Sequence, residues 1–311
     1  MTAVLVLAAV AAACVQASST LSVACWPRRS PAAAIVLWQA IGLGWGLAAV
    51  GTLIGLGTAT HRSGLAGSAL SQVAGFLDGR AHAPLGFLAA ARLVCLAAGL
   101  VLLSLLVGVL LSVSTAVLRA RQRQRVLLSL LAHGDPKVPG ALVVDYPAAA
   151  AYCLPGLHSA IVISAGTLDL LDSDELAAVL AHERAHLRER HDLVLLPFIA
   201  LLHGFGWSRA ARQAHRAVAL LVEMHADDRA LRQRPARELA TALLRVGAAG
   251  GGLAPSGALA AIEADLGGEV AARVTRLLRP APSLSAPALA LVGLAAVLAV
   301  IVPAAVLVIP F

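Results

Sequence analysis

Charged residues are scarce in this sequence. Only 13% of its 311 residues are Asp, Glu, Lys or Arg, whereas 59% are hydrophobic. Soluble globular proteins carry roughly 25% charged residues. The deficit argues against a soluble protein and favours a protein whose main partner is the lipid bilayer.

Aromatic residues are also few, and the cysteines are not arranged in pairs. Aromatics make up 4% of the chain, and no RNA- or DNA-binding motif accompanies the net charge of +7. We therefore expect the basic residues to meet anionic lipid and expect no direct nucleic acid binding. The four cysteines form no Cys-x-x-Cys pair, which excludes a disulfide framework and a cysteine-ligated zinc site. They are Cys14, Cys25, Cys95 and Cys153.

Four apolar stretches are each long enough to cross a bilayer, which requires about 20 residues. They run over Val4–Trp26, Ala32–Thr58, Leu85–Val117 and Pro287–Phe311. Polar residues interrupt the first stretch, which can also be interpreted as a signal peptide cleaved after Ala17. We favour an uncleaved span, because the first residues carry no Lys or Arg. The sequence thus predicts four transmembrane helices.

The arginines outside these stretches predict the orientation of the chain. They concentrate in three places, after the first span, after the third and before the fourth: Arg28, Arg29, Arg119, Arg121, Arg123, Arg125, Arg273, Arg276 and Arg279. Because positively charged loops stay in the cytoplasm, both termini are expected outside the cell. We predict a multi-pass plasma membrane protein with three spans in residues 1–118, a cytoplasmic domain in 119–284 and a fourth span in 285–311.

The stretch 119–284 is polar enough and long enough to form an α+β domain. It contains two predicted strands and three predicted helices: Leu142–Asp145, Ser159–Ser164, Ser173–Arg190, Arg209–Gln233 and Gly268–Leu278. Asp172 and Glu175 are spaced to form a capping box. The strand at Ser159–Ser164 is either a free edge that pairs with an extended substrate or a strand buried by its neighbours. Leu193–Trp207 is apolar but too short to span a bilayer, and is either a buried or interfacial hairpin or an ordinary core helix.

One motif in this domain has the residue types and spacing of a catalytic metal site. His182, Glu183 and His186 form a His-Glu-x-x-His sequence within the helix predicted at Ser173–Arg190. Residues four apart lie on one helix face, so both histidines can bind one metal ion. Glu183 can then act as a general base on a water bound to that metal. The alternative is a helix with two solvated histidines and a surface glutamate. We expect the motif to hold Zn²⁺ in a zinc metalloprotease.

A catalytic zinc needs a third protein ligand. Glu223 lies one helical turn before Asp227 and can complete a site of two histidines and one glutamate. Asp227 can hydrogen-bond the far nitrogen of a ligand histidine. His225 is the rival third ligand, although it points away from that face of a regular helix. Arg273 is a candidate for an oxyanion or substrate contact, or is one of the arginines that mark the cytoplasmic face.

These residues resemble those of known families. The His-Glu-x-x-His motif followed by Glu-x-x-x-Asp resembles the gluzincin metalloproteases. The longer stretch from Ala151-Tyr-Cys-Leu-Pro-Gly to the motif is similar to the M48 membrane quality-control proteases and the M56 antibiotic-sensing receptor proteases. Three spans before the domain and one after it resemble the M56 receptors of the BlaR/MecR type, and M48 more distantly. The resemblance implies a zincin-like domain, the ligands His182, His186 and Glu223, and a BlaI/MecI-like transcriptional repressor as the protein substrate.

Three functions remain open at this point. The chain can be a regulatory protease that cuts a repressor or signalling protein, a protease that clears damaged membrane proteins, or a catalytically inert receptor or scaffold. The presence of Glu183 beside a full ligand set favours an enzyme, because an inert relative has no need of a general base. The sequence has no Ser-x-x-Lys motif, so we expect no covalent β-lactam sensing by this chain.

Overall fold

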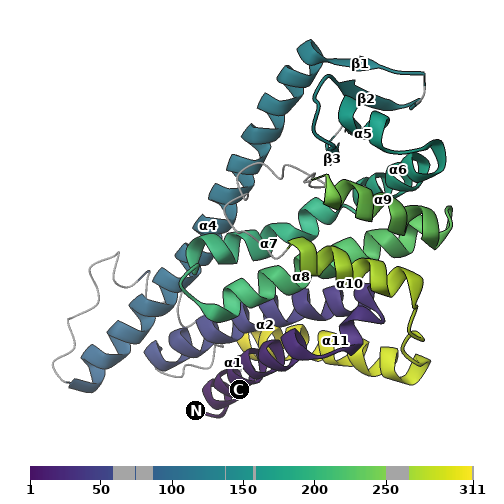
Figure 1. Ribbon diagram of the computed structural model, residues 1–311. Coiled ribbons are helices and arrows are strands. Elements are labelled where there is room, and N and C mark those ends of the chain that lie inside the picture. The colour runs from purple at the N-terminus through teal and green to yellow at the C-terminus, as the bar shows by residue number, and fades with distance from the viewer. Residues whose placement is uncertain (59–73, 75–86, 137, 157–158, 250–265, 310–311) are drawn as a thin grey trace. The chain divides into compact units, whose positions relative to one another are not determined.

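The computed structural model describes the chain except for residues 59–73, 75–86, 137, 157–158, 250–265 and 310–311 (Figure 1). The chain divides into two compact units. The first unit consists of residues 1–111, 198–217 and 284–311, and the second of residues 112–197 and 218–283. Each unit is described by itself.

Four helices among the described residues are long and apolar enough to cross a membrane. They are α1 (Thr2–Val23), α2 (Pro31–Gly57), α4 (Phe87–Leu131) and α11 (Ala286–Val308). The predicted spans are therefore confirmed as helices of sufficient length. α4 differs most from the prediction, because it continues through the arginines that follow the span and reaches 45 residues. A short 3₁₀ helix, η1 (Trp26–Arg28), precedes α2.

Small residues allow α2 to approach its neighbours in the first unit closely. A side chain at Gly44 would clash with the backbone carbonyl of Ala299 in α11. A side chain at Gly51 would likewise crowd the side chains of Leu307 and Leu7. Helices in lipid associate through van der Waals packing at such small residues, since burial from water does not drive them together. The contact between α2 and α11 thus depends on the missing side chain at Gly44.

Replacing Gly44 by alanine is expected to lower the thermal unfolding midpoint of the detergent-solubilised protein. The new methyl group must push α11 away, and overpacking of this kind costs about 1–3 kcal/mol. Gly42 is the matched control, since among the described residues nothing lies within 4 Å of a side chain added there. Gly42→Ala should leave the midpoint unchanged or raise it, because alanine favours the helix. Equal midpoints for the two variants would contradict this packing.

The stretch predicted as a hairpin or a core helix is a single helix followed by a turn. α7 runs over His191–Gly204 and contains Pro197, and α8 begins after the turn, at Arg209, and ends at Ala230. The residues 198–217 belong to the first unit. There the ring of Phe198 packs edge-on against Trp38, with ring centroids 6.4 Å apart. The hairpin interpretation of this stretch is therefore wrong.

The second unit contains a four-stranded sheet. Its strands are β1 (Ala132–Gly134), β2 (Ala141–Val144), β3 (Ala151–Leu154) and β4 (Ala160–Ser164), and their order across the sheet is β1-β2-β4-β3. β2 and β4 are parallel, whereas β1 and β3 pair antiparallel with their neighbours. β4 is paired on both sides, so the suggestion that it forms a free edge is wrong. Among the described strands, β3 pairs with β4 alone and forms the edge of the sheet on that side.

Helix α6 (Ser173–Arg188) fills the space between this sheet and two later helices, α9 (Ala236–Ala248) and α10 (Leu266–Leu278). One of its faces contributes Leu176, Val179 and Leu180 to a core with strand residues such as Val143, Ile161 and Ile163. Another face places Ala178 and Ala181 against α9 and α10. A short helix, α5 (Ala165–Leu170), leads into α6. Since α6 is covered on two sides, its orientation is fixed.

Candidate metal centre and active site

Helix α6 carries the His-Glu-x-x-His motif and begins with the capping box that the sequence predicted. The Asp172 carboxylate accepts hydrogen bonds from the backbone N–H groups of Asp174 and Glu175, at 3.0 and 2.9 Å. The Glu175 carboxylate accepts in return from the Asp172 N–H at 3.1 Å, and it pairs with Arg245 of α9 at 2.7 Å. The start of α6 is thereby tied to α9, which holds in place the motif that begins about two turns later.

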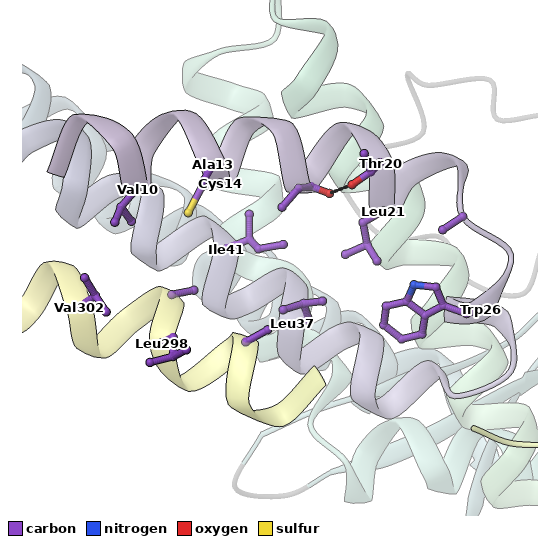
Figure 2. A pocket seen from close by; sticks show the side chains of 14 residues that line it. Val10, Ala13, Cys14, Thr20, Leu21, Trp26, Leu37, Ile41, Leu298 and Val302 are labelled. Carbon is purple, nitrogen blue, oxygen red and sulfur yellow. Dashed lines mark hydrogen bonds between the residues drawn. The ribbon is translucent and has the colours of Figure 1, made fainter. Parts of the chain in front are cut away.

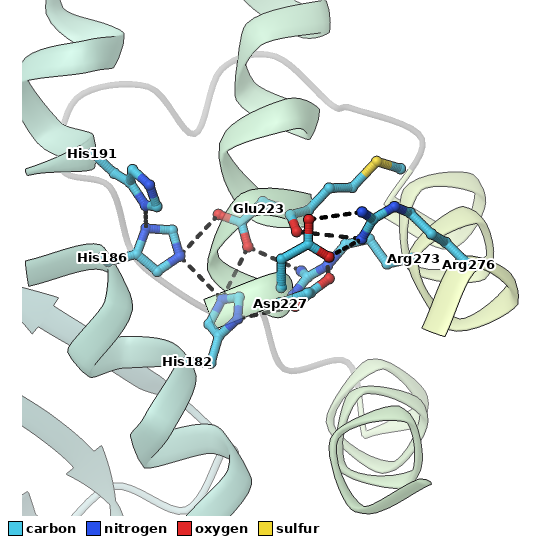
Figure 3. Close-up of polar contacts among 9 residues, drawn as sticks. His182, His186, His191, Glu223, Asp227, Arg273 and Arg276 are labelled. Carbon is cyan, nitrogen blue, oxygen red and sulfur yellow. Dashed lines mark hydrogen bonds and ion pairs between the residues drawn. The ribbon is translucent and has the colours of Figure 1, made fainter. Parts of the chain in front are cut away.

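Three side chains that can bind a metal ion converge at α6 (Figure 3). Nε2 of His182 lies 3.0 Å from Nε2 of His186 and 3.3 Å from Oε2 of Glu223. Nε2 of His186 lies 3.5 Å from Oε1 of Glu223. A zinc ion with bonds of about 2.0–2.1 Å and tetrahedral angles keeps its ligand atoms roughly 3.3 Å apart. The three side chains therefore fit a zinc ion.

The glutamate of this group is ionised, as a metal ligand must be. Burial raises the pKa of Glu223, but His186 and Arg273 outweigh that effect and hold the pKa well below its usual value. Burial likewise lowers the pKa of His182, whereas the carboxylates of Asp227 and Glu223 raise it, to about 9. A metal ion at the site therefore competes with a proton on His182.

Asp227 lies next to His182, on the side of the ring away from the other candidate ligands. Its Oδ1 is 3.0 Å from Nδ1 of His182, although the ring N–H does not point squarely at the oxygen. Both side chains are 1% exposed. A carboxylate at this position keeps the proton on Nδ1, so that Nε2 of the ring is free to bind a metal.

Glu183 is buried next to the same cluster. Its pKa is raised, first by burial and also by Glu223, while His182 and His186 act in the opposite direction. Both histidines are therefore close enough to the Glu183 carboxylate to affect its pKa. Glu183 therefore lies near the candidate ligands, and its role as a general base stays a prediction.

Arg273, on α10, contacts the acidic residues of the cluster. Its guanidinium donates to both oxygens of Asp227, at 2.9 and 2.7 Å, and lies 3.0 Å from Oε2 of Glu223. Only 5% of Arg273 is exposed. All three of its guanidinium nitrogens are thus directed at carboxylates. The guanidinium of Arg273 thus positions the carboxylates of Asp227 and Glu223. The suggested contact of Arg273 with an oxyanion or substrate stays a prediction.

Replacing Arg273 by glutamine is expected to destabilise the second unit by about 3–5 kcal/mol, because it leaves the Asp227 carboxylate buried without its main partner. Arg276→Gln is the matched control, since the pair between Arg276 and Asp228 on the same two helices is partly exposed. That pair should contribute about 0–1 kcal/mol. Unfolding midpoints of the purified variants measure the difference. Equal losses would show that Arg273 does not anchor the cluster.

Two further histidines extend the cluster. Nδ1 of His191 lies 3.0 Å from Nδ1 of His186, and the ring of His225 lies 5.4 Å from that of His191. Burial, followed by electrostatic interaction with His186 and His225, lowers the pKa of His191 to about 3. His225 is outside the group of potential metal ligands found among the described residues, and its Nε2 lies 3.9 Å from Glu189. The sequence did not predict the contact between His191 and His186. It shows only that His191 follows the motif by five residues.

Comparison with known proteins gives one positive result. Residues 117–240 match the sequence model of Peptidase family M48. The matched range contains the three candidate ligands, Glu183 and Asp227, and it ends before Arg273. No curated protein and no solved structure matches the chain significantly. The match supports a peptidase, and the two histidines and glutamate of the site fit the metal dependence of that family.

Proposed function

We propose that this protein is a zinc-dependent endopeptidase of the gluzincin type, anchored in the plasma membrane. The observation that carries the proposal is the convergence of His182, His186 and Glu223 beside the buried Glu183. The match of residues 117–240 to a peptidase family supports it independently. The four long apolar helices supply the anchor.

The residues of the site divide the chemistry between them. His182, His186 and Glu223 would hold the zinc ion, which when bound lowers the pKa of a water and polarises the scissile carbonyl. Glu183 takes a proton from the attacking water and passes it to the leaving amine nitrogen. Glu223 is one third exposed, whereas His182 is 1% exposed. Substrate therefore approaches from the side of Glu223.

The edge strand β3 is the best candidate for binding the substrate backbone. It pairs only with β4 among the described strands, and α6 packs against it. Burial and then the Glu183 carboxylate raise the pKa of the Cys153 thiol in the middle of β3. The strand thus lies within electrostatic range of the general base. An extended peptide that pairs with β3 would pass the catalytic residues.

The proposed substrate is a cytoplasmic repressor or another signalling protein. The distribution of arginines around the spans favours a cytoplasmic catalytic domain in residues 119–284 and termini outside the cell. Three spans before the domain and one after it resemble the M56 receptor proteases of the BlaR/MecR type, whose substrates are BlaI/MecI-like repressors. We infer regulated proteolysis from this arrangement.

The M48 match favours a second candidate, the clearance of damaged membrane proteins. The two functions differ in selectivity, because clearance cuts many unfolded chains and regulation cuts few. Quantitative proteomics of protein N-termini in cells with wild type or Glu183→Gln separates them. One or two new cytoplasmic termini would support regulation, and many membrane-protein fragments would support clearance. Identical termini in both strains would contradict an enzyme and favour an inert receptor or scaffold.

A further inference from the structure

The turn after α6 brings a third histidine back to the metal site. α6 ends at Arg188, and Arg190 has a φ of +52°, in the left-handed region that non-glycine residues rarely adopt. The carbonyl of Arg190 then accepts from the backbone N–H of Leu193 at 2.9 Å, which starts α7 at His191. On a continuous helix, residues five apart do not share a face. The turn, rather than helical spacing, therefore places His191 against His186.

The contact between the two rings is close and buried. Nδ1 of His191 lies 3.0 Å from Nδ1 of His186, with the ring planes at 84° (Figure 3). His191 is 2% exposed. Asp192, the next residue, pairs with Arg121 of α4 at 3.0 Å, which fixes the start of α7 within the second unit. The ring of His191 thus has a defined position and is shielded from water.

The protons on these two rings are determined by the metal site. Nε2 of His186 faces the other candidate ligands, so it must carry a lone pair when it binds a metal. A neutral imidazole then has its proton on Nδ1. That N–H points at His191, whose own Nδ1 must accept it. The proton of a neutral His191 consequently lies on Nε2, which has no partner among the described residues.

We propose that His191 is a positioning residue that accepts the Nδ1–H of His186 and so fixes the tautomer in which His186 presents Nε2 to the metal. The inference rests on the proposed function only in requiring a metal at this site. The two ligand histidines are then held by different partners, His182 by the Asp227 carboxylate and His186 by a neutral ring. Partners of this kind orient a ligand, and their loss usually weakens metal binding by about 10–100-fold.

Zinc affinity of the purified full-length protein, measured by competition with a chromophoric chelator in detergent, tests the proposal without any substrate. His191→Leu removes the acceptor and should weaken zinc binding by about 10–100-fold. His191→Asn should keep binding within a few-fold, since its carbonyl oxygen is bonded to Cγ as Nδ1 is. His191→Gln places its amide one carbon further away and should resemble His191→Leu.

His225→Leu is the control for removing a neighbouring ring, because the ring of His225 packs against His191 but does not belong to the candidate ligand group. This variant should bind zinc as wild type does. Circular dichroism of the metal-free variants verifies that they fold. If His191→Leu does not fold, the difference in zinc affinity between His191→Asn and His191→Gln tests the proposal instead. Wild-type affinity in His191→Leu or His191→Gln overturns the proposal. Equal losses for Asn and Gln, or for His225→Leu, overturn it as well. A wild-type protein that binds no zinc overturns the proposed metal site together with it.

Discussion

Glu183→Gln is expected to abolish peptide hydrolysis while zinc stays bound. Glutamine keeps the shape of the side chain but cannot take a proton from water, and loss of a general base costs about 10²–10⁴-fold in rate. The three candidate ligands are untouched, since Glu183 is not among the atoms that converge on the metal position. The measurements are kcat/KM on an unfolded protein substrate and the zinc content of the same sample.

Glu189→Gln is the matched control for this variant. Glu189 lies just after the same helix and pairs with Arg229 at 2.8 Å, outside the ligand group. Its replacement should leave both the rate and the zinc content within a few-fold of wild type. Full activity in Glu183→Gln would remove Glu183 from the reaction. Loss of zinc in that variant would instead give Glu183 a role in holding the metal.

The candidate site was predictable from the sequence where the chemistry depends on local spacing. His182 and His186 are four residues apart on a helix whose start is predicted by the capping residues. Glu223 and Asp227 repeat the same spacing on α8. The structure brings these four side chains together, with the Asp227 carboxylate 3.0 Å from the far nitrogen of His182. Helical spacing therefore identified the face of each helix that carries these residues, whereas the need of a zinc ion for a third ligand suggested that the two faces meet.

The remaining parts of the site depend on contacts between distant residues. Arg273 is 46 residues from Asp227, and the neighbouring arginines suggested that it marks the cytoplasmic face as readily as that it contacts substrate. Strand order is equally non-local, so the sequence indicated β4 but not that β3 would cover its outer side. Helix α9 was not predicted, although its face packs on α6. Pairing across the fold, rather than local propensity, decides each of these features.

The position of His191 could not be predicted from the sequence for a different reason. The predicted helix ran to Arg190, and on that helix His191 would have pointed away from His186. The observed chain turns at Arg190 with a positive φ, a conformation for which arginine gives no local signal. A single backbone angle thus converts a residue without an assigned role into a neighbour of a candidate ligand.

Glu223→Ala is expected to reduce zinc affinity by more than about 100-fold, beyond the loss caused by removing a residue that only orients a ligand. The Glu223 carboxylate lies 3.3 and 3.5 Å from the two ligand nitrogens, so its removal leaves two protein ligands. It also removes one of the two carboxylates that Arg273 contacts. Chelator competition measures the affinity, and unfolding of the metal-free proteins separates loss of a ligand from loss of the fold.

His225→Ala is the decisive comparison, since His225 was the alternative third ligand. Its Nε2 lies beside Glu189, and it does not belong to the group that converges with His182 and His186. We expect wild-type zinc affinity in His225→Ala and loss of zinc in Glu223→Ala. The reverse result would require α8 to rotate by about two residues, or roughly 200°. Such a rotation would also withdraw Asp227 from His182 and Arg273, so the same pair of variants tests the helix register on which the whole site depends.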